Sequence, residues 1–207
     1  MGDAIWSVVL PVKRLAAAKS RLRGALDGVR HEELALALAS DTVAAVLACP
    51  LVAEAVVVTA DPVAGEVLAG LGARTVAEAD GDGLNAALVR GAATVAAGRP
   101  VAALTADLPA LRPAELAAAL RTVGTGRCFV PDAAGTGTVL LAAAGTALLP
   151  GFGPDSARRH AGSGARRLDG RWPSLRRDVD TVADLAAAVR LGLGRHTAAL
   201  CPTGVPC

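Results

Sequence analysis

The alternation of two kinds of segment constrains the fold of this chain more than any other feature. Short apolar runs rich in Val alternate with longer stretches rich in Ala and Leu along most of its 207 residues. The short runs predict strands, and the longer ones predict helices that connect parallel strands. We therefore expect an α/β fold, in which a mainly parallel sheet lies between two layers of helices in a three-layer α/β/α arrangement.

The pattern also predicts where the individual elements lie. The expected strands are residues 5–12, 55–59, 73–76, 101–105, 127–131, 138–143 and 176–180. After a short helix in the loop beyond the first strand, the main helices are expected at residues 32–47, 61–71, 83–97, from about 113, and 181–193. Because this length suits one domain rather than two, we assign a single domain to residues 1–195 and expect a disordered tail at 196–207.

The composition excludes several classes of function. The formal net charge is only +2 and aromatic residues make up 2% of the chain, so neither a basic nucleic-acid surface nor a base-stacking platform is expected. No segment has the roughly 18 apolar residues of a membrane-spanning helix. Asp3 also precedes the first apolar run, where a signal peptide would carry basic residues. We expect a cytoplasmic protein with no nucleic-acid or membrane partner.

Acidic residues stand at the ends of two expected strands. Asp107 follows residues 101–105, and Asp178 and Asp180 lie in the last strand, two apart and therefore on one face. Ligands of open α/β sheets bind at the carboxyl ends of the strands, and carboxylates with substrate phosphates suit Mg²⁺. An alternative is that Asp107 caps the helix near Pro113 and Asp180 caps the last helix. Asp178 fits that alternative least, because a carboxylate inside a strand needs a partner.

A basic loop follows the first strand. Only two of the 21 basic residues are Lys, and both are here, as Lys13 and Lys19, with Arg14 between them. In a chain so poor in Lys, these positions are candidates for sites at which chemistry resists replacement. Such a loop suits a polyphosphate, although it has none of the glycines of a Walker A motif. For Arg21 and Arg23, a solvated helix start is an equally good interpretation.

Three further segments carry polar groups suited to a ligand. Asn85, the only Asn, offers donors and an acceptor for a nucleoside, or else caps a helix after a Gly-rich turn. The turn 135–137 leads to Thr138, and the turn 151–156 contains Gly153 and Ser156. Exposed amides and hydroxyls in such turns are able to hold a phosphate, and ordinary loops are the alternative. His160 follows the second turn and is expected to end a short Arg-rich helix rather than act as a base.

Six short segments occur in a characteristic order. They are Pro-Val-Lys-Arg-Leu-Ala-Ala-Ala-Lys-Ser-Arg-Leu (11–22), Gly-Leu-Asn-Ala-Ala-Leu (83–88), Ala-Asp-Leu-Pro-Ala-Leu (106–111), Gly-Thr-Gly-Thr (135–138), Phe-Gly-Pro-Asp-Ser-Ala (152–157) and Asp-Val-Asp-Thr (178–181). Over residues 5–195, this order resembles the guanylyltransferases that make the phosphodiester precursor of the deazaflavin coenzyme F-420. That family uses 2-phospho-L-lactate or phosphoenolpyruvate, and it has a Rossmann-like nucleotidyltransferase fold.

The resemblance implies roles for the residues already selected. The residues implied in GTP binding are Lys13, Arg14, Lys19, Asn85 and Asp107, among which Lys13, Lys19 and Asp107 are catalytic. The residues implied in Mg²⁺ binding are Asp107, Asp178 and Asp180. The residues implied in binding the acceptor's phosphate or carboxylate are Thr138, Gly153 and Ser156.

The expected reaction is the transfer of GMP from GTP to phosphoenolpyruvate, which yields enolpyruvyl-diphospho-5'-guanosine and pyrophosphate. The alternatives are the same reaction with 2-phospho-L-lactate or 3-phosphoglycerate, and a non-catalytic nucleotide-binding regulator on the same scaffold. A phosphohydrolase with a nucleophilic Asp is disfavoured, because the first strand is followed by Lys13 and Arg14.

Overall fold

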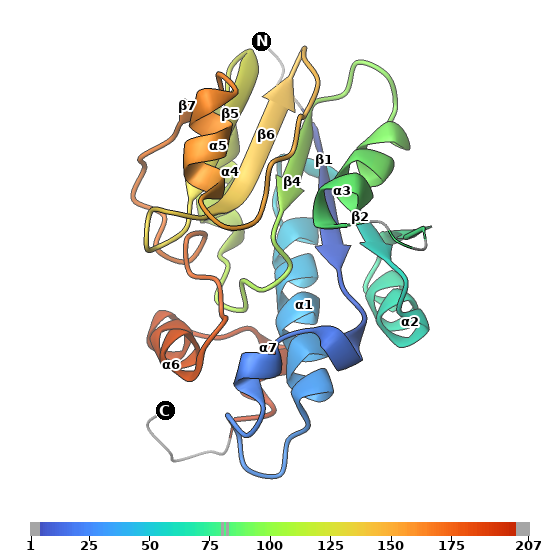
Figure 1. Cartoon of the computed structure of the whole chain (residues 1–207), viewed down its shortest axis with the longest axis vertical. Helices are drawn as coiled ribbons and strands as arrows, with labels where there is room; N and C mark the ends of the chain where they lie inside the picture. Colours follow the sequence, from blue (N-terminus) through green and yellow to red (C-terminus); the bar gives the residue numbers. More distant parts are fainter. Residues whose placement is uncertain (1–4, 80, 82, 202–207) are drawn as a thin grey trace.

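A seven-stranded sheet forms the centre of the structure (Figure 1). The computed structural model describes residues 5–79, 81 and 83–201. In spatial order the strands are β3 (Arg74–Ala77), β2 (Val52–Thr59), β1 (Trp6–Val12), β4 (Val101–Leu104), β6 (Thr138–Ala144), β5 (Gly126–Pro131) and β7 (Arg166–Arg167). Within this described sheet, β6 alone runs antiparallel to its neighbours. The predicted mainly parallel sheet is therefore confirmed.

Helices cover both faces of the sheet. α1 (His31–Leu47), α2 (Pro62–Gly70) and α4 (Pro113–Arg121) pack on one face, and α3 (Leu84–Ala93) and α5 (Ser156–Gly162) pack on the other. In β1, Val8 and Leu10 point to the first face and Val9 to the second, since side chains alternate along a strand. The three-layer α/β/α arrangement is confirmed. Across the described part of the chain, no helix has the length and apolar character needed to cross a membrane.

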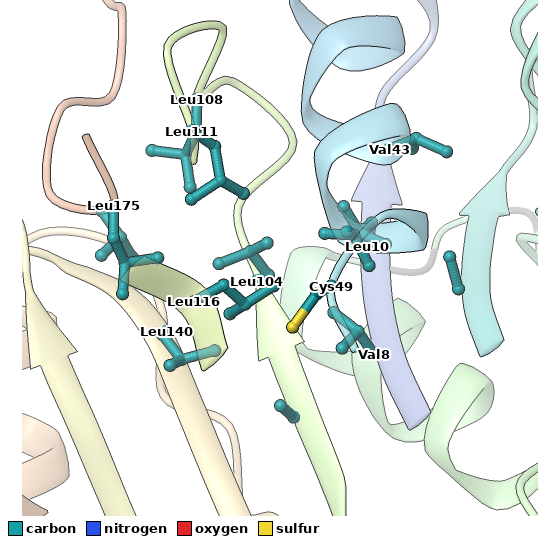
Figure 2. Packing of buried hydrophobic residues seen from close by; sticks show 14 of the residues in the cluster. Val8, Leu10, Val43, Cys49, Leu104, Leu108, Leu111, Leu116, Leu140 and Leu175 are labelled. Atoms are coloured by element: carbon teal, nitrogen blue, oxygen red, sulfur yellow. The ribbon is translucent and has the colours of Figure 1, made fainter. Parts of the chain in front are cut away.

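The first face buries the larger of the two cores. Leu10 of β1 and Leu104 of β4 lie near Leu116 of α4 and the thiol of Cys49 (Figure 2). None of these four side chains is more than 2% exposed. Burying a leucine side chain completely contributes about 1.5–3 kcal/mol to stability. Cys49 is the small core residue that its apolar segment predicts.

Local sequence determines where two of the helices begin. The Asp61 carboxylate accepts a hydrogen bond from the Ala64 amide at 3.0 Å, so it caps α2 as its place before Pro62 predicts. Thr181 and Asp184 form a capping box at the start of α6 (Val182–Leu191), the helix expected at 181–193. These caps fix the helices whose preceding loops contribute to the site described below.

A third apolar cluster lies at the end of the sheet to which β1 and β4 point, in the lower part of Figure 1. After β1 the chain forms two short 3-10 helices, η1 (Leu15–Ala17) and η2 (Ser20–Leu22). Leu22 packs in this cluster with Leu34 and Leu38 of α1. Val179, from the loop before α6, and Leu185 of α6 complete the contact. The cluster thereby holds the loop after β1 against the loop before α6.

The structure differs from the predicted strand at residues 176–180, which form a loop. The alternation Arg-Asp-Val-Asp resembles a half-buried strand, but Val179 is buried in the third cluster and not in the sheet. Its amide donates to the Asp107 carbonyl at 3.1 Å, one hydrogen bond instead of a ladder. Asp178 and Asp180 therefore owe their places to this loop and not to the face of a strand.

The structure also differs from the expected tail after Arg195. Residues Arg195–Ala198 form α7, which packs against α1. Asp41 of α1 accepts hydrogen bonds from the amides of His196 at 2.9 Å and Thr197 at 2.8 Å. Because the capping acid lies 155 residues earlier in the chain, the local sequence gives no sign of this helix. The rest of the expected tail, residues 202–207 with Cys207, lies outside the described residues.

Candidate active site

Lys19 lies between two of the predicted acidic residues. Its ammonium forms ion pairs with the carboxylates of Asp107 and of Asp180, the latter at 2.6 Å. Burial disfavours the charge of Lys19, but attraction to Asp107 and then to Asp180 raises its pKa above the ordinary value. Lys19 has a left-handed backbone with a φ of 53°, which costs a residue with a side chain about 1–3 kcal/mol. The two ion pairs help to hold this strained conformation.

The helix-capping alternative for these acids is wrong. The N-cap residue of α4 is Arg112, and its amide donates to the Ser174 hydroxyl at 3.0 Å. The residue that caps α6 is Thr181, whose hydroxyl accepts from the Asp184 amide. Asp107 and Asp180 instead direct their carboxylates at Lys19. Both side chains are therefore left for a role in the site.

Asp178 completes a set of like charges. Burial raises the pKa of Asp178 to about 7, and repulsion from Asp107, Asp180 and Asp132 adds to this effect. One oxygen of Asp107, Oδ1, is buried and has no hydrogen-bond partner among the described residues. We call Lys19, Asp107, Asp178 and Asp180 the charged cluster. Its excess of negative charge and the unpaired oxygen of Asp107 favour a bound cation.

The three aspartates are not arranged as a finished metal site. Among the described residues, no group of three or more His, Cys, Asp or Glu side chains is close enough to hold a metal ion. Lys19 occupies the space between Asp107 and Asp180. Metal binding by the three aspartates therefore stays a prediction.

Two adjoining pockets open beside the charged cluster. One, of about 330 Å³, is lined by Lys19, Asp107 and Asp180. The other, of about 420 Å³, is lined by Arg14 and continues to Glu78. Lys13 lines both pockets, and its side chain and that of Arg14 are exposed. The basic loop thus lies between the acidic residues and the second pocket, which is where a polyphosphate would need it.

Asn85 connects two loops. Its side-chain amide donates to the Phe152 carbonyl at 3.1 Å, and its side-chain oxygen accepts from the Phe152 amide at 2.8 Å. The helix-cap alternative is wrong, because Gly83 is the N-cap of α3. Asn85 therefore fixes the start of α3 to the turn 151–156. Its predicted part in nucleotide binding stays a prediction.

The three residues predicted to bind the acceptor lie close to one another, and we call Thr138, Gly153 and Ser156 the cradle. Thr138 begins β6, and because β6 runs antiparallel to β4, it lies beside the segment that leads to Asp107. Gly153 has a φ of 120°, a conformation that favours glycine. Its carbonyl accepts from the Ser156 amide at 3.1 Å. Thr138 and Ser156 are 5% and 2% exposed, whereas Gly153 is exposed, so the cradle joins two buried residues to a turn at the surface.

The order of these features along the chain matches known proteins. Residues 6–167 match a sequence model of the family described as "Guanylyl transferase CofC like". The chain belongs to this guanylyltransferase family. A protein of Salinispora arenicola named phosphoenolpyruvate guanylyltransferase is 62% identical over 206 residues, which cover 98% of this chain and 96% of that protein.

Solved structures show the fold of this guanylyltransferase. A nucleotidyl transferase from Methanothermobacter thermautotroptrophicus has a TM-score of 0.63 and 23% identity, over 92% of this chain and 98% of that one. The Rv0371C protein of Mycobacterium tuberculosis, in a complex with manganese, has a TM-score of 0.55 and 22% identity, over 90% and 98%. At these identities the likeness concerns the fold alone. The predicted nucleotidyltransferase fold is confirmed.

Three residues near the candidate site were not selected as site residues by the sequence analysis. Asp132 accepts hydrogen bonds from the amides of Thr136 and Gly137, at 3.1 and 2.9 Å, and so shapes the turn before Thr138. An Asp before a Gly-Thr-Gly turn is a signal that could have identified it. Glu78 carries no local signal, because its place in the second pocket follows from the strand order. His160 lies in the last turn of α5, as expected, but it is also 1% exposed and contacts Thr138.

Proposed function

We propose that this guanylyltransferase transfers GMP from GTP to phosphoenolpyruvate and forms enolpyruvyl-diphospho-5'-guanosine and pyrophosphate in the biosynthesis of coenzyme F-420. The observation that carries the proposal is the position of the charged cluster. It lies between a pocket with basic side chains, suited to a nucleotide, and a cradle suited to a small anion. The relative that is 62% identical bears the name of this activity. A cytoplasmic location is part of the proposal, because the cytoplasm supplies both substrates.

GTP is the nucleotide that the second pocket fits. Lys13 and Arg14 line it near the charged cluster, where they would bind the triphosphate. Glu78 follows the carboxyl end of β3, and the basic loop follows the carboxyl end of β1. These two strands are separated by β2, so at the usual strand spacing their ends lie about 10 Å apart. A carboxylate only accepts hydrogen bonds, which suits the N1–H and 2-amino donors of guanine. Adenine presents an acceptor at N1 and would be disfavoured there.

A divalent cation, Mg²⁺ in our proposal, would be held by Asp107, Asp178 and Asp180. The unpaired Oδ1 of Asp107 and the raised pKa of Asp178 support this assignment, since both features favour a bound cation. Hard oxygen ligands are those that Mg²⁺ prefers. The ion would neutralise the charge that develops on the phosphates. The manganese complex of the Mycobacterium tuberculosis protein is consistent with a divalent ion in this fold.

The chemistry requires no protein nucleophile. An oxygen of the acceptor's phosphate forms a bond to the α-phosphorus of GTP. The bond from that phosphorus to the bridging oxygen breaks, and pyrophosphate leaves with the electron pair. Lys13, Arg14 and the cradle bring two anions together and offset their repulsion, which accounts for most of the catalysis expected in such a site.

The proposal is tested by the release of pyrophosphate from GTP. The purified protein is incubated with GTP and Mg²⁺ and, in separate reactions, with phosphoenolpyruvate, 2-phospho-L-lactate or 3-phosphoglycerate. We expect the highest kcat/KM with phosphoenolpyruvate, and the nucleotide product identified by mass spectrometry. Turnover with phosphoenolpyruvate no faster than without an acceptor would overturn the choice of acceptor. GTP binding without turnover on any of the three acids would favour a regulator.

A further inference from the structure

His160 is a buried residue for which the proposed function gives no role. It is 1% exposed and lies on α5, with its ring centroid 5.9 Å from that of Phe129 and 5.1 Å from that of Phe152. Nε2 lies 2.9 Å from the backbone nitrogen of Gly151, and Nδ1 lies 2.9 Å from the hydroxyl oxygen of Thr138. One imidazole therefore contacts both segments that form the cradle.

These two contacts fix the position of the ring proton. The Gly151 amide is able only to donate, so Nε2 of His160 accepts its hydrogen bond. In a neutral imidazole the proton is then on Nδ1, and Nδ1–H donates to the oxygen of Thr138. Burial, followed by Arg159 and Arg127, lowers the pKa of His160 to about 4, so the ring is neutral near pH 7.

The direction of this hydrogen bond determines what Thr138 offers a ligand. A hydroxyl has one proton to donate. If Nδ1 lacked the proton, Thr138 would donate to the ring and present only lone pairs to an anion. Because Nδ1–H donates instead, the proton of Thr138 is left for another acceptor. Among the described residues, that hydroxyl makes no second hydrogen bond.

We propose that His160 is a positioning residue that makes the hydroxyl of Thr138 a donor to the anionic acceptor substrate. This inference rests on the proposed function, in which Thr138 binds the acceptor. Through Gly151, the same ring fixes the turn that carries Gly153, and Arg159 adds a hydrogen bond from Nε to the Gly151 carbonyl at 3.0 Å. His160 thus sets both the direction of the donor and the distance between the two sides of the cradle.

Two substitutions separate the two contacts of His160. His160→Asn keeps an amide near the position of Nδ1 and can still donate to Thr138, but it is too short to accept from Gly151. His160→Gln keeps an oxygen near the position of Nε2 for Gly151 but places no donor at Thr138. Thermal unfolding of both variants is measured first, so that kinetics are compared for folded proteins only.

Initial rates are then measured with the acceptor and GTP varied in turn. We expect His160→Gln to raise the KM for phosphoenolpyruvate about tenfold, with a change of less than about twofold for GTP, because one hydrogen bond to a charged group is lost. His160→Asn should stay within about threefold of the wild type. Equal effects of the two variants, or an equal rise in the KM for GTP, would show a purely structural role.

A double-mutant cycle tests whether His160 acts through Thr138. Thr138→Val should raise the KM for phosphoenolpyruvate about as much as His160→Gln does, and the double variant should be no worse than Thr138→Val. Effects that multiply would contradict the proposal. If another acid proves to be the acceptor, the cycle is measured with that acid.

A spectroscopic measurement does not depend on turnover. In the protein labelled with ¹⁵N-histidine, long-range ¹H–¹⁵N correlations report the tautomer of each ring. We expect His160 to carry its proton on Nδ1 between about pH 6 and pH 8. A proton on Nε2 would overturn the inference even if the proposed reaction is correct. The Nδ1 tautomer with no turnover on any acid would mean that the proposed function has failed instead.

Discussion

The charged cluster and the cradle are built from different kinds of groups. The charged cluster and the basic loop beside it use ionisable side chains, and Lys13, Arg14 and Asp180 are exposed. The cradle uses a hydroxyl, a glycine turn and a neutral ring, with Thr138, Ser156 and His160 all at most 5% exposed. The first region depends on charge and the second on fixed hydrogen-bond directions.

The surroundings of each region explain this difference. The Lys19 loop and the loop of Asp178 and Asp180 come from opposite ends of the chain and are joined by the third apolar cluster. Opposite charges attract over several ångströms, so such loops tolerate small movements. The cradle lies on β6 and α5, where Asn85, Asp132 and His160 each fix a backbone group.

The largest expected effect comes from breaking the charged cluster. Asp107→Asn removes one charge and keeps the shape, and we expect kcat to fall at least about a thousandfold, because transition-state charge is no longer balanced. GTP binding should remain measurable by calorimetry. Asp27→Asn, at an exposed acid, is the matched control. Turnover of Asp107→Asn equal to that of the control would contradict the assignment of Asp107.

The buried ring of His160 beside the cradle should make the free energy of unfolding depend on pH. The pKa of His160, about 4, lies below the ordinary 6.5, so between these values the unfolded chain binds a proton that the folded protein does not. The stability that the neutral ring provides is complete above about pH 6.5 and falls as the pH drops towards 4, by roughly 3 kcal/mol in total. Urea unfolding of the wild type and His160→Gln across this range measures the difference.

Asp178 of the charged cluster should have the opposite effect on stability, which increases as the pH falls. Because the pKa of Asp178 is raised to about 7, its protonation favours the folded protein as the pH falls from about 7. The comparison of wild type with His160→Gln, both in EDTA, cancels this contribution. If both proteins lost stability equally between pH 6.5 and pH 4, the depressed pKa of His160 would be wrong.

The two regions also differ in how far the sequence predicted them. Lys13 and Asp107 follow strands, and the carboxyl ends of parallel strands meet at one edge of the sheet, so their places followed from the apolar pattern. The rarity of Asn identified Asn85 as special but not its partner, because Phe152 lies 67 residues away. His160 was correctly assigned to the end of a short helix, but its contacts were not predicted. Its partners, Thr138 and Gly151, become neighbours only when β6 and α5 pack together.

The errors in element assignment have a related cause. Residues 176–180 resemble a strand because Val179 alternates with charged residues, and tertiary packing decided which apolar cluster buries it. The helix α7 depends on a cap supplied by Asp41. Local patterns therefore predicted the layers and the sheet, and they failed where a single long-range contact determines the structure.

A smaller effect is expected from the basic loop. Lys13→Ala removes one of the charges that face both pockets, and we expect the KM for GTP to rise about 10- to 100-fold, as for the loss of a hydrogen bond to a charged group. The KM for the acceptor should change less, if the cradle binds it independently. Arg23→Ala, at an exposed basic residue of the same loop, should leave both constants unchanged. A rise in the KM for the acceptor alone would place Lys13 with the cradle instead.

The smallest expected effect tests whether the nucleotide pocket selects its base by the direction of hydrogen bonds, as we propose that the cradle selects the acceptor. Glu78 would accept from N1–H and the 2-amino group of guanine, and inosine lacks that amino group. We expect the wild type to favour GTP over ITP about tenfold in kcat/KM, and Glu78→Gln to reduce this ratio towards one, since each good pair of hydrogen bonds contributes about 1–3 kcal/mol of discrimination. Glu66→Gln, at an exposed acid on α2, is the control. If Glu78→Gln left the ratio unchanged, Glu78 would not select the base. The nucleotide site would then depend on charge alone, in contrast to the cradle, which depends on hydrogen-bond direction.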